Sequence, residues 1–524
     1  MKKNSIYVTI VVLASCVFFS ACYQDKSRLP DMTIPGIVVD VSGIPTQFTI
    51  GYQEPFSVAP KVTKGGIEVN DQQFEHEWRI NVILNRGETD TIISRERVFS
   101  GTIGNAIAAN PYYLRYKVFD PATGFSKVHS WPLTVVSSFR EGLAVCDSKD
   151  GTNSDFSLFI NSSMTVDWTG EAKVFRNILE NSGQGAYPGL LNRLYYHRAT
   201  NNNYLMAFDQ NNKMQRFATV DFRMDNMSEM FVYFPPNLET YYINKPNQEL
   251  FLVTNAGVMI SNPTVTMLFT GVADASLVST TVNNNVVAVD SWSNHGGIPA
   301  AVWYDKPQGR FYWSYQTMFA PYARPFVDKD EPFNAGNYPG KTAIAGDLTQ
   351  DGNTLAMLMK DDLSGDYGIC TFYKDPFGFD PGAKEFISIP AAGKALIDGA
   401  RKYVFARGQP VLFVVRSEGI YAITFGVNPA NVVTVAKFAA PAGEQILFAK
   451  LFEQGRYKFD RGDWSLPAEL PLNEKALIVA TSSSSGGKVY VLPMINLGTG
   501  DLNANNKLEF GGFGQILDVE HLGY

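Results

Sequence analysis

Alternating apolar and polar positions mark the sequence from residue 37 onward. In FEHEWRINV, residues 74–82, Phe, His, Trp, Ile and Val alternate with charged or amide residues. This period of two predicts a half-buried antiparallel strand, in which His76 is a packed residue rather than a ligand. YYLRYKVFD at residues 112–120 repeats the pattern, and DPATG at residues 120–124 predicts a turn. With a closing strand over residues 131–136, these segments predict an immunoglobulin-like sandwich over residues 37–138.

A second pattern recurs through the rest of the chain: an apolar strand, a turn and another apolar strand. Hairpins of this form start at Phe156, Tyr204, Leu250, Ala300, Leu355, Val411 and Ala476. A small four-stranded sheet cannot bury both faces alone, so hairpins spaced roughly 50 residues apart predict a seven-bladed β-propeller over residues 139–524. A stack of unrelated β-domains is the alternative. Helix signals are few, and residues 171–181 are the best candidate.

The N-terminal segment predicts export. Two lysines precede an apolar stretch over residues 6–19, and Ser20, Ala21 and Cys22 follow it. This order predicts a signal peptide over residues 1–21 that is too short to span a bilayer comfortably. It also resembles a bacterial lipobox, in which Cys22 is the lipidated residue and residues 22–36 form a tether. The alternative is an ordinary secretory signal in which the cysteine stands by chance.

Charge and cysteine content narrow the function classes. The 524 residues carry a net charge of −7, and their lysines and arginines form no basic stripe that would favour nucleic acid. If Cys22 is lipidated, only Cys146 and Cys370 remain in the folded part, so the fold does not depend on a disulfide framework. We expect two separate buried thiols, with a bridge between them as the alternative.

Familiar enzyme and cofactor motifs are absent from the sequence, among them G-x-S-x-G, H-E-x-x-H, C-x-x-C and G-x-G-x-x-G. GNYPGKT at residues 336–342 lacks the first glycine of a phosphate loop and predicts a turn. The acids of DLTQDGN at residues 347–353 and DSKDG at residues 147–151 fit turns better than calcium loops. We therefore expect no cofactor and no metal.

Aromatic residues are densest between residues 290 and 322. An exposed platform for a sugar ring or a peptide, or a hot spot for a partner protein, would draw on this set: Trp292, His295, Trp303, Tyr312, Trp313 and Tyr322. Packing of the same rings between blades is the alternative. Trp292 and His295 lie in the polar segment SWSNHGG, so we expect them to be more exposed than the strand residues.

Three segments resemble the PKD-like family of lipoproteins from gut-type Bacteroidetes. They are CYQDK at residues 22–26, YYLRYKVFDPATG at residues 112–124 and EGLAVCDSKDGTNSDFSLF at residues 141–159. Members accompany SusC/SusD-type importers, each a TonB-dependent barrel with a lipoprotein lid. The resemblance implies a lipid-anchored accessory on the outer face of the outer membrane, which helps capture or hand over a glycan or peptide nutrient. It implies no catalytic residues.

Two functional hypotheses remain open at this point. The first is a non-enzymatic surface protein that binds nutrient, docks on an importer, or does both. The second is a propeller glycoside hydrolase or polysaccharide lyase. An enzyme predicts carboxylates, or His with Tyr or Arg, gathered at one mouth of the ring. A binding protein predicts exposed aromatic residues or a flat docking face.

Overall fold

The structure is a computed structural model that describes a defined set of residues. These are residues 36–52, 54–82, 89–103, 112–139, 141–198, 203–231, 237–244, 251–254, 257–261, 269–272, 287–289, 300–316, 321–330, 332–349, 354–373, 382–455 and 468–523. The chain divides into two compact units. The first comprises the described parts of Met1–Phe48, Phe56–Gly101 and Pro111–Leu133, and the second comprises those of Thr49–Pro55, Thr102–Asn110 and Thr134–Tyr524. The residues expected to form the signal peptide, including Cys22, lie outside the described residues.

The N-terminal strands form three sheets. The first is β1 (Ile37–Asp40), β4 (Lys61–Lys64) and β5 (Ile67–Glu68); the second, in spatial order, is β2 (Phe48–Gly51), β10 (Phe125–Val136), β9 (Tyr112–Asp120), β6 (Glu75–Val82) and β7 (Thr89–Ser94); the third is β3 (Pro55–Val58) and β8 (Phe99–Thr102). A short 3-10 turn, η1 (Asp71–Gln73), precedes β6. These strands lie within residues 37–138, for which the sequence predicts an Ig-like sandwich.

Period-two burial in this unit follows the sequence pattern. Strand β9 alternates strictly between buried and half-buried residues, and its partner β6 buries His76 and Trp78 on the same sheet. His76 Nδ1 lies 2.7 Å from the hydroxyl of Tyr116, which confirms that this histidine is a packed residue with a hydrogen-bond partner. Asp120 accepts hydrogen bonds from the backbone N–H of Ala122 and the hydroxyl of Thr123, so the turn predicted at DPATG is confirmed.

The second unit is a β-propeller. Its described strands form seven blades, each a small antiparallel sheet of at least four strands. In order from the innermost strand outward, the first four blades are as follows: β39 (Gln515–Leu522), β11 (Gly142–Ser148), β12 (Asp155–Ile160) and β13 (Lys173–Phe175); β14 (Leu191–Arg198), β15 (Asn203–Asp209), β16 (Met214–Ala218) and β17 (Met224–Asp225); β18 (Thr240–Asn244), β19 (Phe251–Thr254), β20 (Gly257–Ser261) and β21 (Phe269–Val272); β22 (Val287–Val289), β23 (Ala300–Asp305), β24 (Arg310–Gln316) and β25 (Pro321–Pro325).

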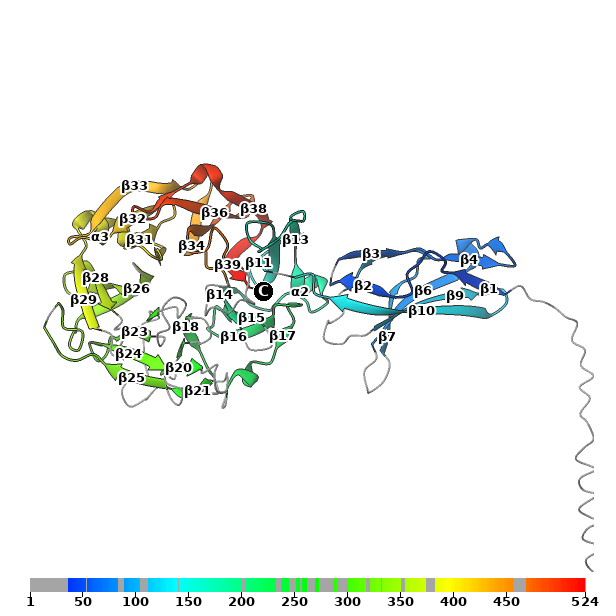
Figure 1. Ribbon diagram of the computed structural model, residues 1–524, viewed down its shortest axis with the longest axis horizontal. Helices are drawn as coiled ribbons and strands as arrows, with labels where there is room; N and C mark the ends of the chain where they lie inside the picture. The colour runs from blue at the N-terminus through cyan, green and yellow to red at the C-terminus, as the bar shows by residue number, and fades with distance from the viewer. Residues whose placement is uncertain are drawn as a thin grey trace, which may run out of the picture. The chain divides into compact units, whose positions relative to one another are not determined.

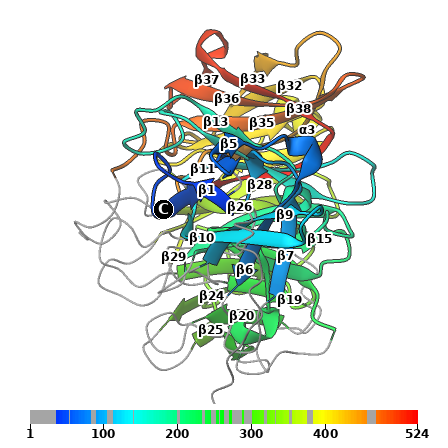
Figure 2. The ribbon, with the colours of Figure 1, turned by 90° about the vertical axis from the view of Figure 1, so that its right-hand side faces the viewer.

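The remaining blades complete the ring shown in Figure 1. They are β26 (Lys341–Thr349), β27 (Thr354–Asp361), β28 (Tyr367–Tyr373) and β29 (Gly382–Ser388); β30 (Lys402–Phe405), β31 (Val411–Val415), β32 (Gly419–Thr424) and β33 (Asn431–Ala439); β34 (Gln445–Leu451), β35 (Ala476–Ser483), β36 (Gly486–Asn496) and β37 (Asp501–Leu502), with β38 (Leu508–Phe513) also paired to β36. Figure 2 shows the blades from the side, from the orange and red strands at the top to the green strands at the bottom. Helical segments are short: α2 (Ile178–Asn181), α3 (Ala391–Ile397), η3 (Met227–Met230) and η4 (Ala504–Asn506).

The two ends of the propeller sequence close the ring within one sheet. The last strand, β39, pairs antiparallel with β11, and Val145 faces Val519 in the register. Strand β39 thereby supplies the innermost strand of the first blade, a position filled in the other blades by the first strand in sequence. Backbone hydrogen bonds between β11 and β39 therefore close the ring.

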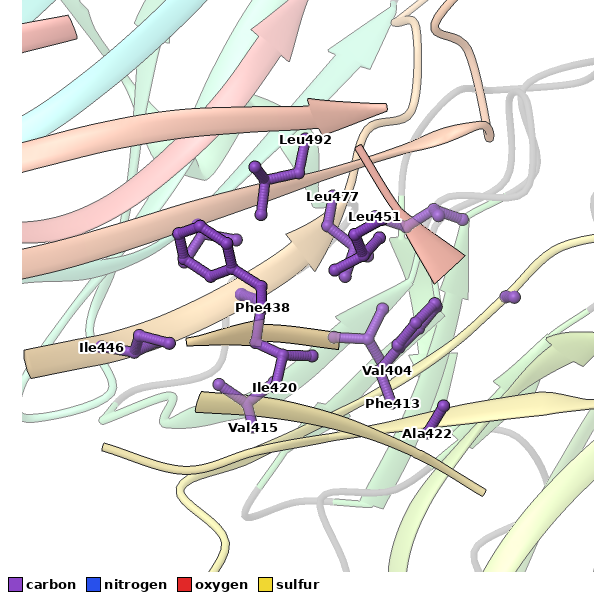
Figure 3. Close-up of a cluster of buried hydrophobic side chains, with 14 of the residues drawn as sticks. Val404, Phe413, Val415, Ile420, Ala422, Phe438, Ile446, Leu451, Leu477 and Leu492 are labelled. Atoms are coloured by element: carbon purple, nitrogen blue, oxygen red, sulfur yellow. The ribbon is translucent and has the colours of Figure 1, made fainter. Parts of the chain in front are cut away.

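Apolar packing between blades forms the core of the propeller. The second strand of the sixth blade, β31, is buried along its whole length, whereas the outermost strand β33 is mostly exposed or half-buried. Figure 3 shows the cluster between the sixth and seventh blades, where Val404 and Phe413 lie among residues of the next blade such as Ile446 and Leu477. Blades cover each other on both faces, so their middle strands carry continuous apolar runs.

Three sequence predictions in this unit need correction. The other predicted hairpins start on the second strand of their blades, whereas the strand near Phe156 is β12, the third strand of the first blade. Residues 171–181 form a helix only over α2, because β13 occupies Lys173–Phe175. Asp147 and Asp347, which we expected in turns, lie in β11 and β26 instead. The turn predicted at residues 336–342 is confirmed, and Gly340 adopts a positive φ of 70° immediately before β26.

Candidate functional site

The predicted aromatic platform is not exposed where the structure describes it. Trp303, Tyr312 and Trp313 are 0%, 1% and 3% exposed, respectively, because they lie in β23 and β24 and pack within and between blades. Trp303 stacks on Tyr312 with ring centres 6.0 Å apart. This burial corrects the platform interpretation for these three residues and supports interblade packing.

The remaining residues of the predicted set are not tested in the same way. Trp292 and His295 lie outside the described residues. Tyr322 belongs to β25, but its side chain is not described. Cys146 and Cys370 are both free and buried, in β11 and β28, as two separate thiols. Burial raises the pKa of both thiols, so neither is a reactive nucleophile.

Charged side chains instead gather around the middle of the ring, on the innermost strands of several blades. Lys450 of β34 is the first of these, and its ammonium group contacts two other blades. Its Nζ donates to Asp518 Oδ2 of β39 at 2.6 Å, to the carbonyl of Val519 at 3.1 Å and to the carbonyl of Leu194 of β14 at 3.3 Å. Burial opposes the charge on Lys450, but Asp518 and Glu520 outweigh it and raise the pKa of the lysine.

The acids of β39 also bond to the backbone of β14. Asp518 Oδ2 accepts from the N–H of Leu194 at 2.6 Å, and Glu520 Oε1 accepts from the N–H of Tyr196 at 2.9 Å. An innermost strand has one edge without a neighbouring strand, so its N–H groups need other acceptors. Asp518 and Glu520 supply them and join the first blade to the second.

A second group, which we call the Arg407 cluster, comprises Asp347, Arg407, Glu453 and Glu474. Arg407 follows β30, and its Nη2 lies 2.7 Å from Glu453 Oε1 and 3.3 Å from Asp347 Oδ1. Arg407 Nε and Nη1 are buried and have no hydrogen-bond partner among the described residues. The side chain of Arg407 is 11% exposed, against 26% for Asp347 and 32% for Glu453.

The electrostatics of the Arg407 cluster favour protonation of Asp347 and Glu474. Burial raises the pKa of Asp347 to about 6, against the lowering effect of Arg407 and with added repulsion from Glu453. Burial also raises the pKa of Glu474. For Arg407 burial opposes the charge, yet Asp347 and Glu453 raise its pKa above the usual range. The guanidinium of Arg407 therefore stays charged, and Asp347 and Glu453 share it as their ion-pair partner.

Sequence reasoning missed these charged residues, although a weak signal exists. Lys450 stands within the apolar run ILFAKLF, and Asp518 and Glu520 alternate with apolar residues in ILDVEHL. An isolated charge on a strand that is otherwise apolar indicates a position facing an enclosed polar space or an ion-pair partner. The signal cannot say which strands come together, because that depends on closure of the ring.

No metal or membrane-spanning feature is found in the part of the chain that the structure describes. No group of three or more His, Cys, Asp or Glu side chains there could hold a metal ion. Among the same residues, no helix is both long enough and apolar enough to cross a membrane.

Similar solved structures are propeller-like proteins of low sequence identity. A quinonprotein alcohol dehydrogenase-like protein from Bacteroides thetaiotaomicron matches with a TM-score of 0.45 and 14% identity, covering 94% of this chain and 97% of that one. AztD from Citrobacter koseri matches at 0.34 and 11%, covering 85% and 97%. BamB from Moraxella catarrhalis matches at 0.28 and 8%, covering 70% and 88%. No protein family and no curated protein matches the sequence. At this level of similarity these proteins assign neither ligand nor activity.

Proposed function

We propose that this protein is a lipid-anchored surface protein of the outer membrane, whose propeller binds a nutrient and presents it to a TonB-dependent importer with its lipoprotein lid. The nutrient is a glycan or a peptide, and the role is non-enzymatic. The lipobox-like segment ending at Cys22 supports the anchor. The propeller supports the binding role, since this fold presents many strand ends and loops around one axis.

The charged centre of the ring is the observation that carries the binding role. Strands from different blades bring Lys402 close to Lys450 and Asp518, and bring Arg407 close to Asp347 and Glu453. Lys402 is exposed to solvent. Ligand sites use a few convergent polar groups to fix orientation. A polar or charged ligand, such as a sugar or a peptide, fits such surroundings better than an apolar one.

Binding and anchoring can be tested separately on the full-length protein. Mass spectrometry of the mature N-terminus should find acyl chains on Cys22, and calorimetric titration with glycan and peptide panels should find a ligand. Affinity purification from solubilised outer membranes should recover an importer subunit. An unmodified N-terminus would refute the anchor, and the absence of both a ligand and an importer subunit would refute the binding role.

A glycoside hydrolase or polysaccharide lyase is the second candidate, and one observation favours it. Asp347 Oδ1 and Glu453 Oε1 lie 3.3 and 2.7 Å from the same nitrogen of Arg407, so the two oxygens are at most 6.0 Å apart. Retaining and inverting glycosidases place two carboxyl groups about 5–10 Å apart, with the pKa of one raised. Glycan turnover that disappears in Asp347→Asn would establish the enzyme. Binding without turnover supports the non-enzymatic role.

A further inference from the structure

Methionine is concentrated at one interface between blades. The cluster of apolar side chains between the second and third blades contains five methionines: Met206, Met214, Met227, Met230 and Met259. Among the described residues, the clusters between blades four and five, five and six, six and seven, and seven and one contain two, none, one and one. Methionine fills irregular gaps in any core, so gap filling alone would distribute it more evenly. The concentration of thioether groups at this interface indicates a second role for them.

Strand register directs thioethers into this cluster from both blades. In the second blade Met214 pairs with Phe208 across β15 and β16, and Met206 lies two residues before Phe208 on the same face. Met206 and Met214 are therefore diagonal neighbours on adjacent strands, a separation that long side chains can bridge. From the third blade, Met259 of β20 belongs to the same cluster and is 2% exposed.

The short turn η3 adds two thioethers on one side of its axis. Side chains three residues apart in a 3-10 helix eclipse each other, so Met227 and Met230 point the same way. They are 9% and 4% exposed. Asn226 caps the turn, because its Oδ1 accepts from the backbone N–H of Ser228 at 3.0 Å. Met227 and Met230 thus enter the cluster as a pair from a segment between the two blades.

The donor atoms favour a soft metal ion of low charge. Thioether sulfur is a soft ligand that suits Cu(I), whereas hard divalent ions prefer oxygen ligands. Burial of a single charge also costs less desolvation energy than burial of a double charge. Arg216 lies on the same face of the second blade as Met206, and its ion pair with Asp225 at 2.9 Å adds no net charge there.

We propose that the thioethers of this cluster, with Met227 and Met230 as the central pair, bind one Cu(I) ion between the second and third blades. Methionine has three rotatable bonds, so rotation of these side chains converts apolar packing into coordination without a change in the strands. Met214 is half-buried and follows the exposed Lys213, which places one thioether at the solvent boundary. The site goes beyond the proposed nutrient-binding function and does not depend on it.

Anaerobic titration of the full-length protein with Cu(I), in competition with a chromophoric Cu(I) chelator, measures the affinity. One ion should bind, Zn²⁺ should not displace it, and X-ray absorption at the copper edge should show sulfur neighbours. The double variant Met227→Leu with Met230→Leu conserves side-chain volume and removes both sulfur atoms. It should weaken binding at least about 10-fold, because loss of even an outer-shell partner of a metal site costs about 10- to 100-fold.

Met224→Leu is the matched control. Met224 pairs with Phe217, which places it on the opposite face of the second blade, and it is 38% exposed. This variant should bind Cu(I) as the parent does, and thermal unfolding should show that both variants are folded. Absence of Cu(I) binding, equal binding by the double variant and the parent, or copper with only nitrogen and oxygen neighbours would each overturn the inference. So would weaker binding in Met224→Leu alone, which would identify an adventitious surface thioether.

Discussion

Lys450 joins three blades, and its removal gives the sharpest test of how the ring is closed. Its Nζ contacts Asp518 at 2.6 Å and the carbonyls of Val519 and Leu194 at 3.1 and 3.3 Å. In Lys450→Met the aliphatic part of the side chain is kept, while the ammonium group is lost. Asp518, with a side chain 5% exposed, then keeps only the N–H of Leu194 as a hydrogen-bond donor among the bonds described here.

The expected loss follows from the burial of the pair. Removing one partner of a fully buried ion pair costs about 3–5 kcal/mol, and a surface pair contributes about 0–1 kcal/mol. Lys450 is 24% exposed, so the pair lies nearer the buried limit. Since Asp518 retains one donor, we expect Lys450→Met to lower the free energy of unfolding by about 2–3 kcal/mol. Because a unit of this size has a large unfolding entropy, this corresponds to a decrease of roughly 2–4 °C in the melting temperature.

Urea unfolding at pH 7, followed by tryptophan fluorescence and circular dichroism, measures this loss. A double-mutant cycle with Asp518→Asn isolates the pair from other effects of each change. Lys213→Met serves as the control for replacing a lysine whose side chain is exposed in a turn. The pKa of Lys450 is raised in the folded state, so its contribution should be complete below about pH 10 and be lost as the pH rises further. A change below about 0.5 kcal/mol, or no coupling in the cycle, would show that the lysine does not hold the ring together.

Three further perturbations test two other buried charged groups and the closing strand β39. Burial raises the pKa of Glu141 to about 7, so the folded state holds a proton that the unfolded state has released, and the free energy of unfolding should fall by up to about 3 kcal/mol between pH 4.5 and 7. In Glu141→Gln the urea midpoint should lose this dependence on pH. An unchanged dependence on pH contradicts the assignment. Arg407→Met leaves Asp347 and Glu453 without their shared cation. It should lower the free energy of unfolding by about 2–4 kcal/mol at pH 8, but by less at pH 5, where Asp347 is protonated. An equal loss at both pH values, measured by thermal unfolding, contradicts this role of Arg407. A chain ending at residue 514 lacks β39 and should be cleaved rapidly by protease in its first blade, with protection restored by a synthetic peptide of residues 515–524; a truncated chain as resistant as the parent would show that β39 is dispensable.

The local pattern of the sequence determined the class of fold. Alternating burial in β6 and β9, and the continuous apolar runs that became middle strands such as β31, follow from the side chains of a strand pointing to opposite faces. The spacing of those runs determined the propeller, since a blade must bury its faces against neighbours. Turns at residues such as Gly340 and Asp120 could also be predicted from the sequence, because their conformations or local hydrogen bonds depend on nearby residues.

Only the tertiary structure decided the position of each strand within its blade and the location of the charged centre. Strand β39 is the innermost strand of the first blade because the ring must close, and no local signal carries that pairing over more than 300 residues between β11 and β39. Lys450, Asp518 and Leu194 meet for the same reason. Trp303 and Tyr312 show the converse: composition marks an aromatic residue as suited both to a core and to a binding surface, and only the packing of neighbouring strands buried these two.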